Sequence, residues 1–262
     1  MGVVNVTPDS FSDGGLYLDP AAAVAHGEEL VRDGAVILDI GGESTRPGAE
    51  PVGEAEELER VVPVVAGLAG AGAEISVDTS KAAVAAAALA AGASIVNDVT
   101  ALRGDAEMAA LCADRGAGLV LMHMAGTPRT MQREPRYGDV VAEVRAFLAA
   151  RIEAALAAGV AEERIWVDPG IGFGKTAAHN FELLRRLAEL RELGRPIVVG
   201  TSRKSFIAAG NDGSAAGERL GGTIASSVLA AVEGADVLRV HDVAELAQAL
   251  SVAAAVLGQK LG

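Results

Sequence analysis

The stretch ISVDTSKAAVAAAALAAGASIVNDV, residues 75–99, decides the fold. It opens with a short apolar run that stops at Asp78, continues with an alanine-rich segment at 81–91, and closes with a second apolar run that stops at Asn97. Alanine favours helix, and short uninterrupted apolar runs are typical of parallel strands buried on both faces. The stretch therefore predicts one strand–helix–strand unit of a parallel sheet.

The same pattern occurs eight times along the chain. The apolar runs lie at 2–6, 36–40, 75–77, 95–96, 119–122, 165–167, 197–199 and 237–240. Eight such units in about 250 residues match a closed barrel of parallel strands. We predict an α/β protein made of a single (β/α)8 TIM barrel, with residues 1–262 as one domain. Polar residues at the strand ends would then meet at one mouth, where such barrels place their chemistry.

The segments between the runs predict eight helices. They cover 19–33, 54–68, 81–91, 105–115, 140–156, 180–193, 218–233 and 242–257. Ser80 and Asp105 are expected to cap the third and fourth helices, because such side chains accept hydrogen bonds from the first backbone N–H groups. The long strand-to-helix loops should all lie at the mouth, which is where binding is expected.

Composition limits the classes of function. Asp and Glu number 35 against 22 Lys and Arg, and aromatic residues make up 3%. An acidic chain poor in aromatics is not a general binder of nucleic acid or anionic membranes. Cys112 is the only cysteine, which excludes an internal disulfide. There is no signal peptide or apolar run long enough to span a membrane, so we expect a soluble cytoplasmic protein.

Three polar residues terminate buried strands: Asp78, Asn97 and Asp168. Buried carboxylates are unfavourable unless they are paired or hydrogen-bonded, so these groups could fix the rim structurally. Alternatively they bind a flat heterocycle rich in N–H donors, since a carboxylate offers two parallel acceptors. Because Lys204 should lie at the same barrel end and supplies a cation, the sequence favours the binding role.

Cations follow the last two strands. Lys204, Arg239 and His241 supply local positive charge, and the loops after strands seven and eight often hold phosphate in these barrels. Arg239 and His241 alternate along a strand, so they should point to the same side. Arg46, with Ser and Thr hydroxyls beside it, could also hold an anion, although a loop arginine is often only solvated.

The segment PGIGFGKT at 169–176 is similar to a phosphate-binding P-loop. Pro169 stands where that motif has its first glycine, and we therefore reject a nucleotidase. The glycines more plausibly let the backbone approach a ligand, with Phe173 exposed to stack. The four histidines lack zinc-like spacing, but a hard cation held mainly by substrate oxygens remains possible.

These segments together resemble the dihydropteroate synthase family of the folate pathway. Seven of them carry the resemblance in family order: NVTPDSFSDGG (5–15), DIGGESTRPG (39–48), SVDTSK (76–81), IVNDV (95–99), DPGIGFGKT (168–176), GTSRKSF (200–206) and RVHDV (239–243). The resemblance implies an enzyme, a target of sulfonamides, that condenses 6-hydroxymethyl-7,8-dihydropterin pyrophosphate with p-aminobenzoate. The products are 7,8-dihydropteroate and pyrophosphate, and Mg²⁺ assists.

The resemblance also implies a role for each matching residue. Pterin binding falls to Asp78, Asn97, Met122, Asp168 and Lys204. Pyrophosphate binding falls to Asn5, Arg46, Arg239 and His241, with Mg²⁺ on Asn5 and Asp13. Phe11, Thr45, Pro47, Phe173 and Ser202 would surround p-aminobenzoate, next to Lys204. Lys204, Asp168, Arg239 and His241 are the expected catalytic residues.

Two alternatives remain open. A methyltetrahydrofolate methyltransferase shares the pterin-binding barrel but would not need the GTSRKSF or GGESTRPG segments. A non-catalytic pterin-binding paralogue should have lost loop residues or the lysine, yet Arg46, Lys204, Arg239 and His241 are all present. The family further implies a homodimer and additional residues before the first strand, so we expect a less covered barrel floor here.

Overall fold

The computed structural model describes residues 1–7, 19–46, 48–210, 213 and 215–258. Its strands are β1 Gly2–Asn5, β2 Ile37–Gly41, β3 Glu74–Asp78, β4 Ile95–Asp98, β5 Gly118–Met122, β6 Ile165–Asp168, β7 Val198–Val199 and β8 Val237–Leu238. The α-helices are α1 Pro20–Arg32, α2 Glu54–Leu68, α3 Ala82–Ala91, α4 Met108–Arg115, α5 Val140–Ala157, α6 Ala177–Arg185, α7 Leu220–Val232 and α8 Val243–Leu257. Short 3-10 helices lie at Glu162–Arg164, Leu187–Leu193, Ser205–Gly210 and Ala216–Glu218.

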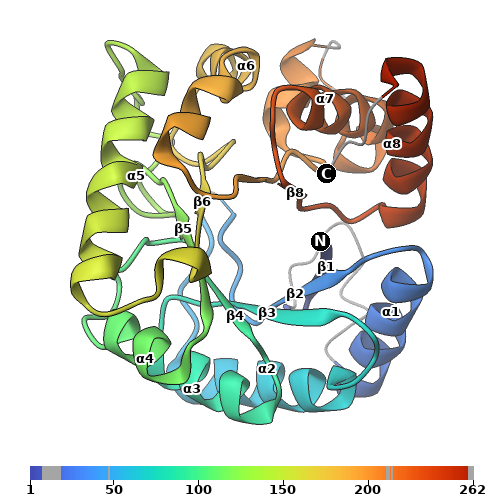
Figure 1. Ribbon diagram of the computed structural model, residues 1–262. Coiled ribbons are helices and arrows are strands. Elements are labelled where there is room, and N and C mark those ends of the chain that lie inside the picture. The colour runs from blue at the N-terminus through green and yellow to red at the C-terminus, as the bar shows by residue number, and fades with distance from the viewer. Residues whose placement is uncertain (8–18, 47, 211–212, 214, 259–262) are drawn as a thin grey trace.

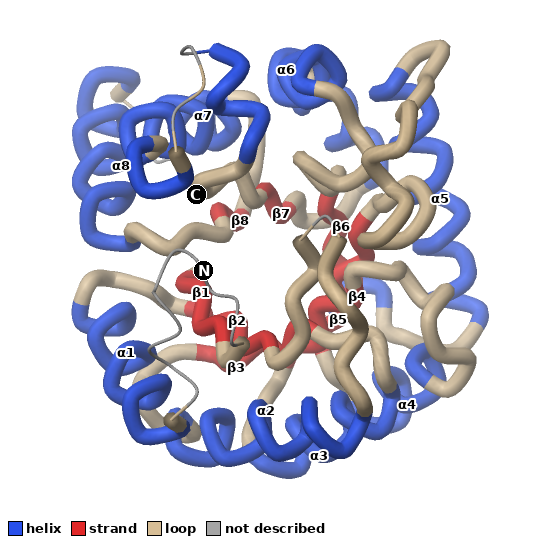
Figure 2. Tube along the Cα trace, turned by 180° about the vertical axis from the view of Figure 1, so that it is seen from behind, coloured by secondary structure: helices blue, strands red, loops and turns tan. Residues whose placement is uncertain are grey.

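The strands form a closed ring inside a ring of helices (Figure 1 and Figure 2). Strands β1 to β6 pair in parallel and in chain order, and β7 pairs in parallel with β8. The ring closes where Val3 N donates to Val240 O and Val240 N donates to Met1 O, both at 3.0 Å. Between β6 and the start of β7, Val167 N donates to Pro196 O at 2.9 Å. The (β/α)8 barrel predicted from the sequence is confirmed.

Two apolar layers stabilise the barrel. The larger lies between strands and helices, where Leu38, Val64 and Leu119 are fully buried. A smaller layer is formed by alternate strand residues, Ile37, Ile95, Val120 and Val198 with Trp166 and Met1 beside them. Branched side chains of this kind fill the interior of such barrels, so the centre is a packed core and the chemistry is confined to the mouth.

Two capping predictions were wrong. Helix α3 has Lys81 at its N-cap position, without a side-chain cap, so Ser80 does not cap it. Instead, Asp105 accepts from Ala82 N at 2.9 Å, which caps α3 from the neighbouring loop. Helix α4 starts at Met108, and Asp105 Oδ1 accepts from Glu107 N at 3.0 Å in the turn that precedes it. The predicted helix 180–193 is also divided, because α6 ends at Arg185 and a 3-10 helix follows.

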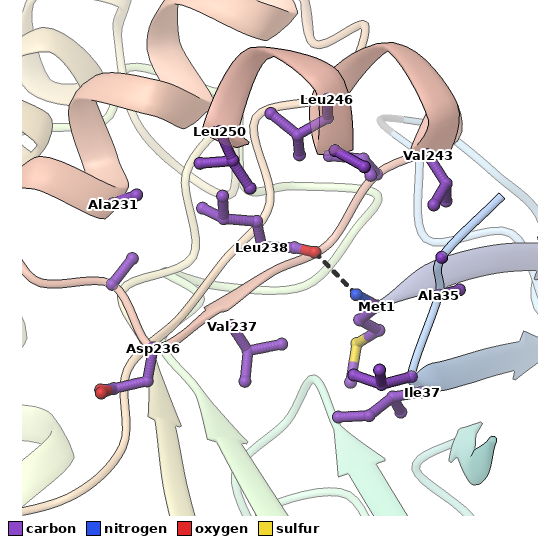
Figure 3. A pocket seen from close by; sticks show the side chains of 15 residues that line it. Met1, Ala35, Ile37, Ala231, Asp236, Val237, Leu238, Val243, Leu246 and Leu250 are labelled. Atoms are coloured by element: carbon purple, nitrogen blue, oxygen red, sulfur yellow. Dashed lines mark hydrogen bonds between the residues drawn. The ribbon is translucent and has the colours of Figure 1, made fainter. Parts of the chain in front are cut away.

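An apolar cavity of about 160 Å³ lies near the N-terminus (Figure 3). It is lined by Met1, Ile37, Val237 and Leu246 among others, and the Met1 amino group donates to Leu238 O at 3.0 Å. Burial lowers the pKa of this amino group to about 6, with Asp39 opposing the shift.

Among the described residues, no helix is long and apolar enough to cross a membrane. The cytoplasmic location stays a prediction.

Candidate active site

The carboxyl ends of the strands surround a cavity of about 430 Å³. Residues from the β1, β2, β3, β6, β7 and β8 ends contribute to its lining: Asn5, Thr7, Glu43, Ser44, Thr45, Arg46, Asp78, Met131, Gly172, Phe173, Gly200, Ser202, Arg203, Lys204, Ser205, Ala216, Arg219, Arg239 and His241. This is the end of the barrel at which the polar strand-terminal residues were expected to meet.

Asp39 is the centre of a buried polar network beneath this cavity. Its side chain is fully buried in β2 and accepts from Ser76 Oγ at 2.6 Å and from Asn97 Nδ2 at 3.1 Å. Arg239 Nε donates to the same carboxylate at 2.6 Å, and Arg239 Nη2 donates to Asp78 Oδ2 at 3.0 Å. One arginine thus joins the ends of β2, β3 and β8, and both carboxylates fix the plane of its guanidinium.

The charges in this network shift one another's protonation. Burial raises the pKa of Asp78 to about 8, the negative charge of Asp39 adds to this, and Arg239 opposes it. Burial acts to lower the pKa of Arg239, but Asp39 and Asp78 outweigh burial and raise it. Among the described residues, none donates a hydrogen bond to Asn97 Oδ1, which is buried. The pair Asp78 and Asn97 therefore offers acceptors to a bound N–H group.

Lys204 and Asp168 form a second charged group at the mouth. Lys204 Nζ donates to Ile171 O at 2.6 Å and lies 4.7 Å from the centre of the Phe173 ring, which is a cation–π distance. Asp168 Oδ1 accepts from Gly170 N at 2.6 Å. Burial raises the pKa of Asp168 while Lys204 opposes the shift. Burial lowers the pKa of Lys204 to about 8, and Asp168 opposes it.

His241 and Ser202 form the rim on the side of β7 and β8. Ser202 Oγ lies 2.9 Å from His241 Nδ1 and accepts from His241 N at 3.3 Å. With its hydroxyl donating to Nδ1, the ring carries its proton on Nε2. Burial lowers the pKa of His241 to about 3, and the charges of Arg239 and Arg203 lower it further. A neutral imidazole among cations indicates a place where an anion would be stabilised.

The β2–α2 loop is anchored from below. Lys81 Nζ donates to carboxylate oxygens of Glu43 and Glu57. Burial acts to lower the pKa of Lys81, but the hydrogen bonds to both glutamates outweigh it and raise the pKa. Glu43 precedes Thr45 and Arg46 in the same loop, and all three residues line the cavity.

The structure brings most of the predicted site residues together. Those that line the cavity are Asn5, Thr45, Arg46, Asp78, Phe173, Ser202, Lys204, Arg239 and His241. Asn97, Met122 and Asp168 are buried at its base and are not among the lining residues. Met122 packs with Val99, Met124 and Met131, against Phe173. Phe11, Asp13 and Pro47 lie outside the described residues.

Asp39, Lys81 and Glu57 carry parts of the site that the sequence reasoning did not assign. Asp39 stands inside the apolar run 36–40, where a charged residue has to find buried partners. A charged residue inside an apolar run was therefore a signal of a buried polar network, but it indicated the interior of the barrel rather than the end of the strand. The Lys81–Glu57 contact joins α2 to the N-cap residue of the next helix, α3, across β3, and no spacing rule connects the two residues.

The donor set at the mouth is compatible with Mg²⁺. Asn5 lines the cavity with a carboxamide, and carbonyl oxygen is a suitable ligand for this hard cation. Within the described residues there is no group of three or more His, Cys, Asp or Glu side chains that could hold a metal.

A closed (β/α)8 barrel with carboxylates beneath its mouth and cations around it has the arrangement of a barrel enzyme with its site at the carboxyl ends of the strands. The pterin binding enzyme family matches residues 1–241 of the chain. The dihydropteroate synthase of Synechocystis sp. is 48% identical over 257 residues, which are 98% of this chain and 89% of that protein. The chain belongs to the dihydropteroate synthase family of pterin binding enzymes.

Solved structures agree with this assignment. The Yersinia pestis dihydropteroate synthase in complex with a sulfonamide drug superposes with a TM-score of 0.95 at 44% identity, covering 98% of this chain and 94% of that one. The Xanthomonas albilineans enzyme in complex with 7,8-dihydropteroate gives a TM-score of 0.87 at 47% identity, covering 98% and 92%.

Proposed function

We propose that the mouth of this barrel condenses 6-hydroxymethyl-7,8-dihydropterin pyrophosphate with p-aminobenzoate. One observation carries the proposal: buried acceptors and clustered cations share one cavity, joined through Arg239. The Xanthomonas albilineans relative binds 7,8-dihydropteroate, the product expected of this reaction. The reaction forms a C–N bond and releases pyrophosphate.

The acceptors at the base of the cavity suit the pterin. Asp78 and Asp168 would accept from the N–H groups of the heterocycle, and Asn97 Oδ1 lacks a donor among the described residues. Met122 and its apolar neighbours would pack on the ring face, and Lys204 would donate to the ring edge.

The polar and cationic groups at the rim suit the diphosphate. Asn5, Arg46, Arg239 and His241 line one cavity, so the two arginines can bind the phosphoryl oxygens as cations while Asn5 and neutral His241 donate hydrogen bonds to them. Positive charge favours departure of the diphosphate because it stabilises the negative charge that develops on the leaving oxygen. Mg²⁺ on Asn5 and Asp13, when bound, would supply further neutralisation of that charge. The electron-rich pterin can stabilise positive charge at its exocyclic carbon, which favours a dissociative path.

p-Aminobenzoate would bind where Phe173, Thr45 and Ser202 line the cavity. Phe11 and Pro47, which the family resemblance assigns to the same substrate, lie outside the described residues. The arylamine then needs positioning more than activation, since its nitrogen is already nucleophilic. The Phe173 ring next to Lys204 provides an aromatic face and a cation for the ring and carboxylate of this substrate. The Yersinia pestis relative binds a sulfonamide drug, and we propose that sulfonamides compete for this same pocket.

Release of pyrophosphate that depends on p-aminobenzoate tests the proposal. Purified protein is mixed with the pterin pyrophosphate, Mg²⁺ and p-aminobenzoate, and both pyrophosphate and the mass of 7,8-dihydropteroate are followed. A non-catalytic pterin-binding paralogue would bind the pterin without product. A methyltetrahydrofolate methyltransferase would require a corrinoid partner and release no pyrophosphate.

We propose further that the protein forms a homodimer through α7 and α8. These adjacent helices expose apolar side chains, with Leu229 exposed by 62% and Val256 by 80%. Exposed apolar residues grouped on two packed helices are typical of a protein–protein contact. Light scattering after gel filtration gives the mass, and a Leu229→Glu/Val256→Glu double variant is expected to shift it to the monomer. An unchanged mass in the double variant would refute this interface.

A further inference from the structure

Lys175 is a buried lysine that makes none of the substrate contacts proposed above. Its side chain is 3% exposed, and it belongs to the segment at 169–176 whose P-loop similarity was rejected. Nζ donates to Gly170 O at 2.9 Å and to Phe173 O at 3.0 Å, and lies 2.8 Å from His123 Nδ1. Three acceptors match the three donors of an ammonium group.

The same contacts serve the neutral amine. Burial lowers the pKa of Lys175 to about 7, while Asp168 opposes the shift. A neutral amine keeps two N–H groups for the two carbonyls, and its lone pair can accept from Nδ1 of the other His123 tautomer. The contacts to the loop therefore persist in both protonation states.

The loop at 170–174 is held by side chains at nearly every peptide. Asn180 Oδ1 accepts from Gly172 N at 2.7 Å and Gln132 Nε2 donates to Gly172 O at 2.7 Å. Tyr137 Oη donates to Gly174 O at 2.8 Å. Lys175 differs from these partners because it alone among the described residues bonds both Gly170 O and Phe173 O, the two ends of the turn.

The glycines of this loop make such anchoring necessary. Gly170, Gly172 and Gly174 have φ values of 67°, 84° and 66°. Glycine reaches this region freely but also has the most conformational freedom to lose, so the loop has little preference of its own. A Cβ at Gly170 would lie 1.9 Å from His123 O, which excludes larger residues that would stiffen the turn. The turn has one backbone hydrogen bond of its own, Phe173 N to Gly170 O at 3.0 Å, and bonds from side chains add to it in selecting one conformation.

We propose that Lys175 is a positioning residue that fixes the 170–174 loop so that the Phe173 ring and the Ile171 carbonyl hold Lys204 in place. Lys204 Nζ bonds Ile171 O and lies over the Phe173 ring. The Ile171 carbonyl and the Phe173 side chain both belong to the chain segment between Gly170 O and Phe173 O, the two carbonyls that Lys175 joins. The inference rests on the proposed function for its kinetic consequence, because Phe173 and Lys204 line the p-aminobenzoate pocket.

The test compares Lys175→Met, which removes all donors, with Lys175→Gln, which keeps two donors on a shorter neutral side chain. Hydrogen exchange in peptides covering 169–175 is expected to become about tenfold faster in Lys175→Met, as expected for the loss of two hydrogen bonds. The KM for p-aminobenzoate is expected to rise about tenfold with a smaller change in kcat, because the pocket is misplaced. Lys175→Gln should lie between wild type and Lys175→Met.

Ile152→Ala is the matched control, because Ile152 is a buried core residue in the second half of α5, away from the mouth. It should lower thermal stability without changing exchange in 169–175 or the KM. Wild-type exchange in both Lys175 variants, or faster exchange with an unchanged KM, would overturn the proposal. If Lys175→Met does not fold, Lys175→Gln decides by the same two measurements. Wild-type protein that releases no pyrophosphate refutes the proposed function instead, and the exchange result still decides whether Lys175 holds the loop.

Discussion

Asp39→Asn isolates the charge of the buried network from its geometry. Asp39 Oδ2 accepts from Arg239 Nε and Asn97 Nδ2, while Oδ1 accepts from Ser76 Oγ. An asparagine can place its oxygen toward Arg239 and Asn97 and its NH₂ group toward Ser76, whose hydroxyl can accept instead of donate. The number of hydrogen bonds is then preserved, and what is lost is the negative charge opposite Arg239.

The magnitude follows from that loss. A hydrogen bond to a charged group contributes about 1.5–3 kcal/mol and a neutral one about 0.5–1.5 kcal/mol, so two bonds to Oδ2 lose about 2–3 kcal/mol. Asp78, at 3.0 Å, is then the remaining carboxylate hydrogen-bonded to Arg239. If the lost energy appears as misplacement of Arg239, kcat/KM for the pterin pyrophosphate falls about 30- to 150-fold.

The assay is the initial rate of pyrophosphate release at saturating p-aminobenzoate and varied pterin pyrophosphate. Ser76→Ala is the control, since it removes the hydrogen bond to Oδ1 but leaves the charge of Asp39 and both bonds to Oδ2 in place. Its loss should lower stability by about 1.5–3 kcal/mol, because the acceptor is charged, but should change kcat/KM less than Asp39→Asn does, because Arg239 keeps its carboxylate partner. Thermal unfolding of both variants checks that they are folded. A kcat/KM for Asp39→Asn within twofold of wild type, or equal to that of Ser76→Ala, would show that the charge of Asp39 does not orient Arg239.

Three further predictions follow from the same contacts. Lys204→Ala and Asp168→Asn should each lower kcat about 100-fold or more while thermal unfolding changes little, because both groups act on substrate; rates near wild type in both would refute the assignment. Burial lowers the pKa of Lys204 to about 8, so kcat/KM should fall as the pH rises above that value and the cation is lost, and Lys204→Arg should remove this fall from the pH profile. Lys81→Met leaves the carboxylate of fully buried Glu57 without its cation and should cost about 3–5 kcal/mol in denaturant unfolding, part of which Glu57→Gln restores in the same chain.

The parts of this protein that the sequence predicts are those set by local pattern. Eight apolar runs gave the strands, because buried parallel strands need apolar residues on both faces. Strand-end residues such as Asp78 and Arg239 were placed at one mouth, because parallel strands share a direction. Asp105 was assigned to the wrong helix, because its partner Ala82 N lies in a neighbouring unit and only packing brings the two together.

Long-range pairing also explains what the sequence could not show at the site. Arg239 and Asp39 are 200 positions apart, and their contact depends on closure of the ring between β8 and β1. In the sequence, Lys175 stood out only as part of the segment at 169–176 that is similar to a P-loop. Its role depends on which carbonyls it reaches, and that is set by three left-handed glycines together with the His123 position. The spacing of residues along the sequence shows which residues are unusual, whereas their contacts in the folded structure determine their roles.

The charge distribution links the fold to the chemistry. The chain carries a formal net charge of −13, yet Arg46, Arg203, Lys204, Arg219 and Arg239 all line one cavity. A cationic cavity in an acidic protein attracts a small dianion while the surrounding surface repels polyanions, which raises selectivity for the diphosphate group. Within this group, Asp39 and Asp78 pair with Arg239, Asp168 stabilises the charge of Lys204, and Asp242 pairs with Arg203. Arg239 bonds the carboxylates and also belongs to the cations of the cavity. Substitution of Arg239 should therefore weaken binding of the pterin and of the diphosphate together.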